Sequence, residues 1–135
     1  MSQENVELLR RLFELFSERD LDWDLVFELV APDIVWEVRP DFPDAAVHIG
    51  PDGMRRLSDG FDDVVDETWY RPLEFIESAD QVVVPLRWGG LGAGSRAAFA
   101  EREETWVFTF RDARISHVTE YATKREALEA VGLSE

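Results

Sequence analysis

The chain has 135 residues, of which 45% are hydrophobic, and its 29 acidic and 14 basic side chains give a formal charge of −15. This length and composition predict one packed domain over residues 1–135, because a chain of this size can bury a sizeable core. The negative field repels phosphate backbones and anionic lipid headgroups, so we expect neither nucleic acid nor a membrane surface as a partner.

Several classes of chemistry are excluded by what the sequence lacks. It contains no cysteine, which removes thiol catalysis and cysteine-ligated metals. The two histidines have no metal-ligand spacing with carboxylates, and there is no phosphate loop or dinucleotide fingerprint. No apolar run approaches the roughly 20 residues that span a bilayer, and the N-terminus is acidic and amphipathic. We therefore expect a cytoplasmic protein that carries no metal and no cofactor.

Two helices and a short strand are predicted in the first third of the chain. Apolar residues recur at helical spacing over residues 3–18 and again over residues 21–29. Pro32 should end the second helix, because the residue before a proline is pushed out of the helical region. Residues 34–38 then indicate a strand, and residues 39–50, with two prolines and several acids, indicate an irregular loop at the rim of the fold.

The middle of the chain changes from a helical to a strand period. A third helix should begin at Gly50-Pro51, since proline is favoured in the first turn, and continue to about Asp66. Pro85 cannot donate to a strand ladder, so it indicates an edge or a bulge. Strands are predicted over residues 68–78, 82–88, 97–110 and 115–121.

The last third is the most clearly patterned segment. Residues 111–114 form a tight turn between the last two strands, and a helix follows. Thr123 and Glu126 have the spacing of a capping box, and Gly132 lies where a helix C-cap belongs. Helices followed by a meander of strands predict an α+β fold, in which a long antiparallel sheet curves around the N-terminal helices. Such a curved sheet, lined with rings, should enclose a pocket rather than a solid core.

Glu120 is the principal candidate for chemistry. Strand alternation places it on the same face as Val118, and Trp106 on the neighbouring strand should share that face. A carboxylate on an apolar wall has a raised proton affinity, as a general acid or base requires. The alternatives are a surface glutamate or one that Arg87 neutralises.

Two further side chains are candidates for catalysis. Arg87 could orient a substrate oxygen, although such an arginine is often part of a structural ion pair. His48, in the loop before the third helix, could shuttle protons, or it could be an ordinary exposed side chain. His117 should face away from Glu120, on the outer face or at a dimer contact.

Aromatic side chains are the candidates for ligand binding. Trp36 and Trp106 should line the pocket, with Trp88 and Phe108 beside them, although rings of this kind are core residues by default. The acids at positions 101, 103 and 104 fall on both faces of their strand, and the sequence leaves open which one points inward.

Several segments together resemble one known family. They are Met1–Glu7, Ala31–Trp36, Gly50–Arg55, Trp106–Tyr121 and Arg125–Leu133. The chain resembles the SnoaL-like members of the nuclear transport factor 2-like (NTF2-like) superfamily along its whole length. The resemblance implies a cone-shaped α+β barrel, commonly a homodimer through the outer sheet face, with a pocket at the wide end. The superfamily includes steroid isomerases, polyketide cyclases, epoxide hydrolases, dehydratases and binding domains without chemistry.

The catalytic sets of that superfamily are incomplete in this sequence. By rough alignment, the positions of the isomerase's donor, base and protonated acid fall near Leu12, Arg39 and Trp106, none of which has the needed chemistry. The epoxide-hydrolase pattern is an arginine between two carboxylates. Glu120 and Arg87 match two of its members, but the companion acid is not evident beside Arg87.

Two functions therefore remain open from the sequence. One is cofactor-independent acid–base catalysis, of the isomerase, cyclase or hydratase type, on a small apolar or aromatic molecule. The other is a non-catalytic module of the same fold that binds a ligand or dimerises. The family also usually has glycine at the position of Ala113, where alanine costs about 1 kcal/mol if the backbone needs a positive φ.

Overall fold

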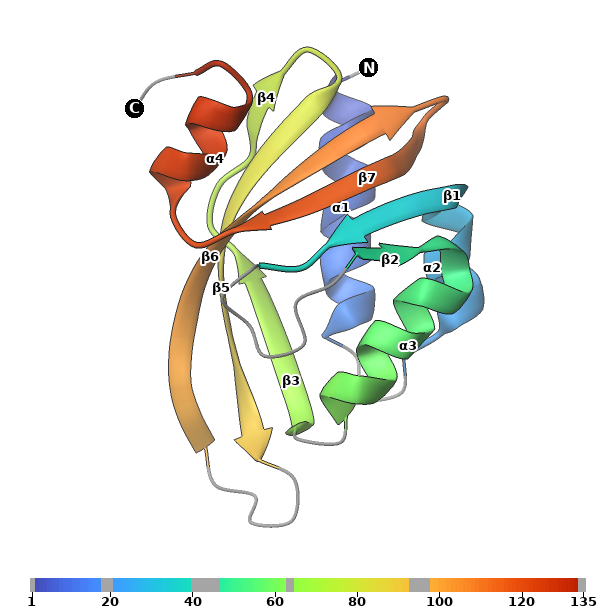
Figure 1. Cartoon of the computed structure of the whole chain (residues 1–135), viewed down its shortest axis with the longest axis vertical. Coiled ribbons are helices and arrows are strands. Elements are labelled where there is room, and N and C mark those ends of the chain that lie inside the picture. Colours follow the sequence, from blue (N-terminus) through green and yellow to red (C-terminus); the bar gives the residue numbers. More distant parts are fainter. Residues whose placement is uncertain (1, 18–20, 40–46, 63–64, 93–97, 134–135) are drawn as a thin grey trace.

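The structure is a computed structural model that describes residues 2–17, 21–39, 47–62, 65–92 and 98–133. Four helices and seven strands follow the chain in the order shown in Figure 1. The elements are α1 (Ser2–Phe16), α2 (Trp23–Leu29), β1 (Val30–Glu37), β2 (Val47–Ile49), α3 (Gly50–Asp62), β3 (Val65–Pro72), β4 (Ile76–Ser78), β5 (Gln81–Gly92), β6 (Ala98–Arg111), β7 (Arg114–Tyr121) and α4 (Lys124–Ala130).

The seven strands form one curved sheet in the order β2-β1-β7-β6-β5-β3, with β4 also paired to β5. All the pairs are antiparallel except β1 with β7, which run parallel. The sheet is therefore mixed, and the expectation of an antiparallel sheet is wrong at this pair. The reason is that β1 and β7 are separated by most of the chain, so no hairpin fixes their relative direction. The α+β class is confirmed.

The two faces of the sheet are covered differently. Helices α1, α2 and α3 contribute to the large core on the inner face, where the middle of the apolar stripe of α1 is buried. On the outer face, Ala127 and Leu128 of α4 pack against Val83 and Val107. Figure 1 shows α4 apart from the other three helices. None of the helices in the described part of the chain is both long and apolar enough to cross a bilayer.

Strand β5 lies in the interior of the sheet, so Pro85 does not mark an edge. Antiparallel partners flank β5 on both sides. Strand β6 pairs with it along one side, and on the other side β4 pairs with its beginning and β3 with the rest. Pro85 lies where that second partner changes, and its carbonyl accepts a hydrogen bond from the Leu73 N–H at 2.8 Å. Residues 73–75 therefore interrupt the strand predicted over 68–78, which the structure divides into β3 and β4.

Other boundaries differ in smaller ways. Helix α3 begins at Gly50 as predicted but ends at Asp62 instead of near Asp66. Residues 47–49, predicted as part of a loop, form the edge strand β2 against β1, while residues 40–46 of that loop lie outside the described residues. The glycine-rich end of β5 continues as a strand to Gly92. Gly89 is required there, because a Cβ would lie 2.7 Å from the ring of Trp69.

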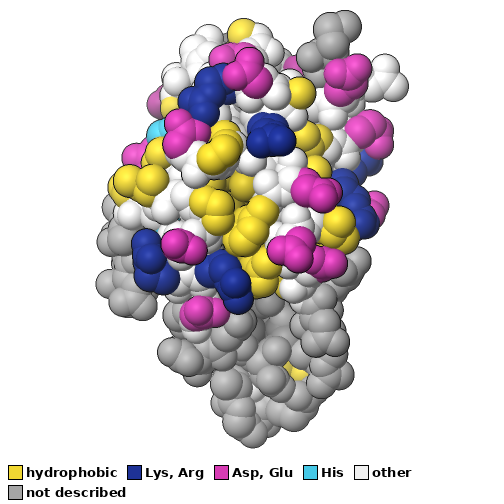
Figure 2. Space-filling view, turned by 90° about the vertical axis from the view of Figure 1, so that its right-hand side faces the viewer, with side chains coloured by type: hydrophobic (Ala, Val, Ile, Leu, Met, Phe, Trp, Pro, Cys, Tyr) yellow, Lys and Arg dark blue, Asp and Glu magenta, His cyan; other side chains and the backbone are white. Residues whose placement is uncertain are grey.

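The face that includes α2 and α3 is mixed in character. Figure 2 shows hydrophobic side chains gathered in its middle and arginines and acids around them. At the edge of the sheet, Val47 and Ile49 of β2 are 56% and 62% exposed. The edge strand therefore presents apolar side chains to solvent.

The predicted caps and turn around β7 are confirmed. Thr123 Oγ1 accepts a hydrogen bond from the backbone N–H of Glu126 at 3.2 Å, and Gly132 ends α4 with a φ of +80°. In the hairpin between β6 and β7, Asp112 and Ala113 have φ values of 53° and 62°. Two consecutive positive φ values are typical of a type I′ turn, so alanine occupies a position that favours glycine.

Replacing Ala113 by glycine should stabilise the protein. Glycine adopts positive φ without the steric cost that a Cβ imposes, which is about 1 kcal/mol. Urea unfolding monitored by circular dichroism should show a higher free energy of unfolding for Ala113→Gly. The change Ala130→Gly at the end of α4 serves as a control that should not stabilise. Equal or lower stability of Ala113→Gly would contradict the strain at this turn.

Candidate active site

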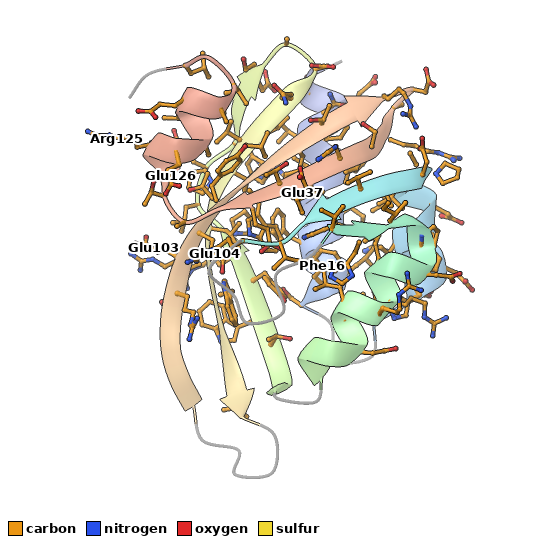
Figure 3. The ribbon with its side chains drawn as sticks, viewed as in Figure 1. Phe16, Glu37, Glu103, Glu104, Arg125 and Glu126 are labelled. Atoms are coloured by element: carbon orange, nitrogen blue, oxygen red, sulfur yellow. The ribbon has the colours of Figure 1, made fainter. Side chains whose placement is uncertain are left out.

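The inner face of the sheet brings two glutamates together from neighbouring strands. Glu120 of β7 is paired in register with Trp106 of β6, as strand alternation predicted. Glu104 lies two residues before Trp106 and therefore shares that face, and it is 3% exposed. Glu103 is exposed, and Figure 3 shows it on the opposite side of β6 from Glu104. Glu104 is thus the inward acid among the three that the sequence left open.

Glu104 is held by two tryptophans and an arginine. Its Oε2 accepts a hydrogen bond from Trp88 Nε1 at 2.6 Å, and its Oε1 accepts one from Trp106 Nε1 at 2.8 Å. Arg39, two residues after the end of β1, places Nη1 at 3.6 Å from Glu104 Oε2. A buried carboxylate needs donors and a counter-charge, and these three side chains supply both.

Glu120 has fewer stabilising contacts than Glu104. Its Oε2 accepts a hydrogen bond from Trp36 Nε1 at 2.6 Å, and the backbone N–H of Arg39 also donates to the carboxylate. The residue is 8% exposed. Loss of hydration on burial raises the pKa of Glu120 from 4.5 to about 7, opposed by the Trp36 hydrogen bond and reinforced by the charge of Glu104. At neutral pH the carboxyl group is therefore present in both protonation states.

Aromatic rings surround the two carboxylates. Trp36 meets Trp106 edge to face with ring centroids 5.4 Å apart, and Tyr70 of β3 lies 5.8 Å from Trp106 and 6.4 Å from Trp88. Phe16 of α1 lies 6.0 Å from both Trp36 and Tyr70. The three tryptophans are almost fully buried, whereas Phe16, Tyr70 and Arg39 are only partly buried. These three side chains are therefore less buried than the tryptophans that hold the carboxylates.

Arg87 does not reach the site. It pairs in register with Glu103 on the outer face, where its Nε lies 3.1 Å from Glu103 Oε1, and it is also 3.9 Å from Glu101. The expectation that it orients a substrate beside Glu120 is wrong, because successive residues of a strand point to opposite faces. Trp88 is the inward residue next to it, and the arginine that lies beside the inner carboxylates is Arg39.

The two histidines lie on opposite faces. His48 is directly opposite Trp36 in the β1–β2 ladder, so it shares the inner face, and its Nε2 is buried with no hydrogen-bond partner among the described residues. His117 lies on the outer face as predicted, with its Nε2 2.5 Å from Glu37 Oε2. Thr119 donates to the same oxygen at 3.0 Å. The His117 hydrogen bond is the main reason that the pKa of Glu37 is lowered.

The predicted ring set is brought together on the inner face, but its members differ in position. Trp36, Trp88 and Trp106 donate directly to the carboxylates. Phe108 is fully buried and packs against Phe13 and Trp36, so it supports the tryptophans. Among the described residues there is no cluster of three side chains that could hold a metal ion.

Sequence reasoning missed the roles of Arg39, Glu104 and Tyr70. For Glu104 a signal was present, since Trp106 was placed inward and Glu104 follows the same alternation. For Tyr70 and Arg39 no comparable local signal exists, because their contacts to β5 and β6 depend on which strands become neighbours. The resulting trio of Arg39, Glu104 and Glu120 has the composition that the epoxide-hydrolase pattern requires, assembled from different strands.

Comparisons with known proteins agree with this fold. The sequence profile of the SnoaL-like domain matches residues 9–118. No curated protein matches the sequence. Among solved structures, an NTF2-like protein of unknown function from Burkholderia pseudomallei is 22% identical with a TM-score of 0.76, and the alignment covers 96% of this chain and 98% of that one.

Two other similar structures contain small molecules. TerC, co-crystallised with polyporic acid, is 19% identical with a TM-score of 0.77 and coverage of 95% and 97%. A protein with a ketosteroid isomerase-like fold from Catenulispora acidiphila, in complex with trimethylamine, is 16% identical with a TM-score of 0.71 and coverage of 94% and 93%. At these identities the similarity establishes the NTF2-like fold.

The pKa of Glu120 predicts a pH-dependent stability difference for Glu120→Gln. Because folding raises this pKa from 4.5 to about 7, the ionised form destabilises the folded state, and stability falls as the pH rises through that window. Relative to wild type, the variant should gain up to about 3 kcal/mol between pH 4.5 and pH 8. Urea unfolding at both pH values measures this difference. A difference independent of pH would contradict the raised pKa.

Removal of the Trp36 indole should raise the pKa of Glu120 further. The N–H that Trp36 donates stabilises the ionised form, and phenylalanine cannot replace it. Carbon-13 NMR of the glutamate carboxyl groups should show an inflection above pH 7 in Trp36→Phe. Trp23→Phe, in the Trp23–Phe27 pair of α2, is the matched control and should leave the inflection in place. An unchanged inflection in Trp36→Phe would refute the role of this hydrogen bond.

Proposed function

The chain belongs to the SnoaL-like domain family, and on that basis we propose that it catalyses cofactor-independent proton transfer on a small apolar or aromatic carbonyl compound. Glu120 is the acid and base, and Arg39 stabilises the substrate oxygen. The observation that carries the proposal is a buried carboxyl group with a pKa of about 7 beside a guanidinium group. The chemistry is of the isomerase or cyclase type.

Glu120 suits both directions of a proton transfer. Its carboxylate would remove a proton from the carbon next to the carbonyl group, and the electron pair of that C–H bond would move to the carbonyl oxygen. The same group, now protonated, would return the proton to another carbon in an isomerisation. In a cyclisation the enolate carbon would instead attack a second carbonyl carbon, whose C=O π electrons would move to its oxygen, and Glu120 would return the proton to that oxygen. A catalytic pKa near the working pH favours both half-reactions.

Arg39 supports this chemistry by its position. Its guanidinium group lies against Glu104, and its backbone N–H donates to Glu120, so the residue links the two carboxylates. An oxyanion that develops beside Glu120 would be near this positive charge in a site of low polarity, where such interactions are strong. The partly buried Phe16 and Tyr70 would contact the apolar part of the substrate.

The similar structures support a small molecule as the ligand. TerC was crystallised with polyporic acid, and the Catenulispora acidiphila protein with trimethylamine. These ligands belong to those proteins, and they support the use of this fold for binding small molecules. The identity of the ligand of this chain depends on its own side chains.

A second candidate function is a non-catalytic module that binds a ligand or dimerises. Two observations favour it. The indole N–H groups are already satisfied by the carboxylates, as a structural network would be, and the edge strand β2 exposes Val47 and Ile49. Homodimer formation through the outer face and cytoplasmic location also stay predictions from the resemblance and the composition.

Hydrogen–deuterium exchange at carbon distinguishes the two candidates. A panel of aromatic and alicyclic ketones, including 2-acetylnaphthalene and cyclohexenone, is incubated with the protein in D2O, and loss of the proton next to the carbonyl is followed by NMR. The wild type should accelerate exchange above buffer, with a rate that rises with pH through an inflection near 7. Glu120→Gln should lower the protein-dependent rate by a factor of about 100 or more.

The outer-face change Glu103→Gln is the matched control, since it alters a glutamate of β6 without touching the site. It should leave the exchange rate unchanged. Exchange that is equal in Glu120→Gln and wild type would remove Glu120 from the mechanism. Binding of the ketones without any accelerated exchange would favour the non-catalytic module.

A further inference from the structure

On the inner face, two described side chains of opposite charge balance each other. Glu104 and Arg39 form an ion pair at 3.6 Å, in which the Glu104 side chain is 1% exposed and that of Arg39 is 14% exposed. Glu120 adds one negative charge when it is ionised and none when it is protonated. Among the described residues, the other cation near this network is Arg102, an exposed side chain whose guanidinium lies 5.7 Å from the Trp88 ring. Its charge is therefore screened by solvent.

We propose that the site accepts an uncharged substrate and excludes carboxylates, and that Glu104 sets this specificity by neutralising Arg39. This inference rests on the proposed function of the site and names its class of substrate. An arginine beside aromatic side chains would otherwise be suited to bind a carboxylate in a bidentate manner. Here the ion pair with Glu104 already compensates its charge.

Glu104 is fixed in place by more than the ion pair. Its two oxygens accept hydrogen bonds from different tryptophans, Trp88 of β5 and Trp106 of its own strand. Rotation of the carboxylate toward solvent would leave both indole N–H groups buried without a partner, which is costly for each group. An incoming anion therefore cannot displace Glu104 from Arg39 without this penalty.

The summed charge of Glu104, Arg39 and Glu120 depends on whether Glu120 is protonated. Among these three described side chains, the charges of Glu104 and Arg39 cancel when Glu120 is protonated, and the three charges sum to −1 when Glu120 is ionised. A carboxylate ligand would raise the negative charge in either case, in surroundings where burial of an uncompensated charge is costly. A neutral ketone meets no such cost, and its oxygen can accept a hydrogen bond from the guanidinium group.

Two naphthalene derivatives of similar size test this inference. Isothermal titration calorimetry at pH 8 compares 2-acetylnaphthalene, which is neutral, with 2-naphthoate, which is an anion. The wild type should bind the ketone at least about tenfold more tightly than the anion, a difference equivalent to about 1.4 kcal/mol. Glu104→Gln retains an acceptor oxygen for an indole but removes the counter-charge that Glu104 gives to Arg39, so it should tighten naphthoate binding about tenfold or more.

Glu103→Gln again provides the matched control. It removes the same charge from the adjacent position of β6 but on the outer face, so the ratio of the two affinities should stay that of the wild type. If Glu103→Gln increases naphthoate binding as much as Glu104→Gln does, the effect is one of overall charge and the inference is wrong.

A measurement on the wild type keeps the test valid if Glu104→Gln does not fold. Lowering the pH from 8 to 6 protonates Glu120 while 2-naphthoate stays ionised, so naphthoate should bind more tightly at pH 6. Among the described residues, the titratable and charged groups on the inner face around Glu120 are Glu104, Arg39, Tyr70 and His48. Because His48 lies on the same face, the shift must persist in His48→Gln.

The outcomes separate this inference from the proposed function. Equal binding of the ketone and the anion by the wild type at pH 8 would overturn the charge selectivity and leave the proton-transfer proposal intact. If neither compound binds the wild type, both proposals fail. Accelerated carbon exchange together with tighter binding of the anion would retain the catalytic role of Glu120 and refute the role of Glu104.

Discussion

The interior of this protein depends on a reciprocal exchange of hydrogen bonds between three tryptophans and two glutamates. A buried indole N–H needs an acceptor, and a buried carboxylate needs donors. Trp88 and Trp106 satisfy Glu104, while Trp36 satisfies Glu120, so each group removes the cost of burying the other. The network joins β1, β5, β6 and β7, and it fixes the direction of the large rings on the inner face.

The two glutamates are not equivalent in this network. Glu104 receives two indole donors and an ion pair with Arg39, whereas Glu120 receives one indole donor, a backbone N–H and only a minor effect of the Arg39 charge. Burial therefore dominates at Glu120 and raises its pKa to about 7. Two glutamates with different surroundings thus differ in proton affinity, an arrangement that is typical of acid–base sites. The same burial makes the ionised form of Glu120 destabilising, so the proposed chemistry and the stability of the fold oppose one another at neutral pH.

The alternation of side chains along the strands divides the site from its surroundings. Odd-numbered residues of β5 and β6, such as Arg87 and Glu103, form ion pairs on the outer face, while their even-numbered neighbours Trp88 and Glu104 form the inner network. A charge change on one face therefore has a matched counterpart one residue away on the other. Comparing the two changes therefore distinguishes an effect of charge in the site from an effect of the overall charge of this acidic protein.

The sequence by itself determined the features that depend on local geometry. The apolar stripe of α1, the turn at Asp112 and Ala113, the capping box of α4 and the pairing of Glu120 with Trp106 all follow from side-chain period, backbone dihedral preference or a short hairpin. They were predicted because each involves residues close in the chain.

Only the tertiary structure decided which groups meet across distant strands. β1 and β7 pair in parallel although some 80 residues separate them, and this pairing brings Trp36 to Glu120 and Arg39 to both glutamates. Nothing in the local pattern around Arg39 indicates its partners, and the local pattern around Arg87 does not show that it lies on the outer face. The physical reason is that strand order and direction are set by the packing of the whole core, whereas period and turn chemistry act within a few residues.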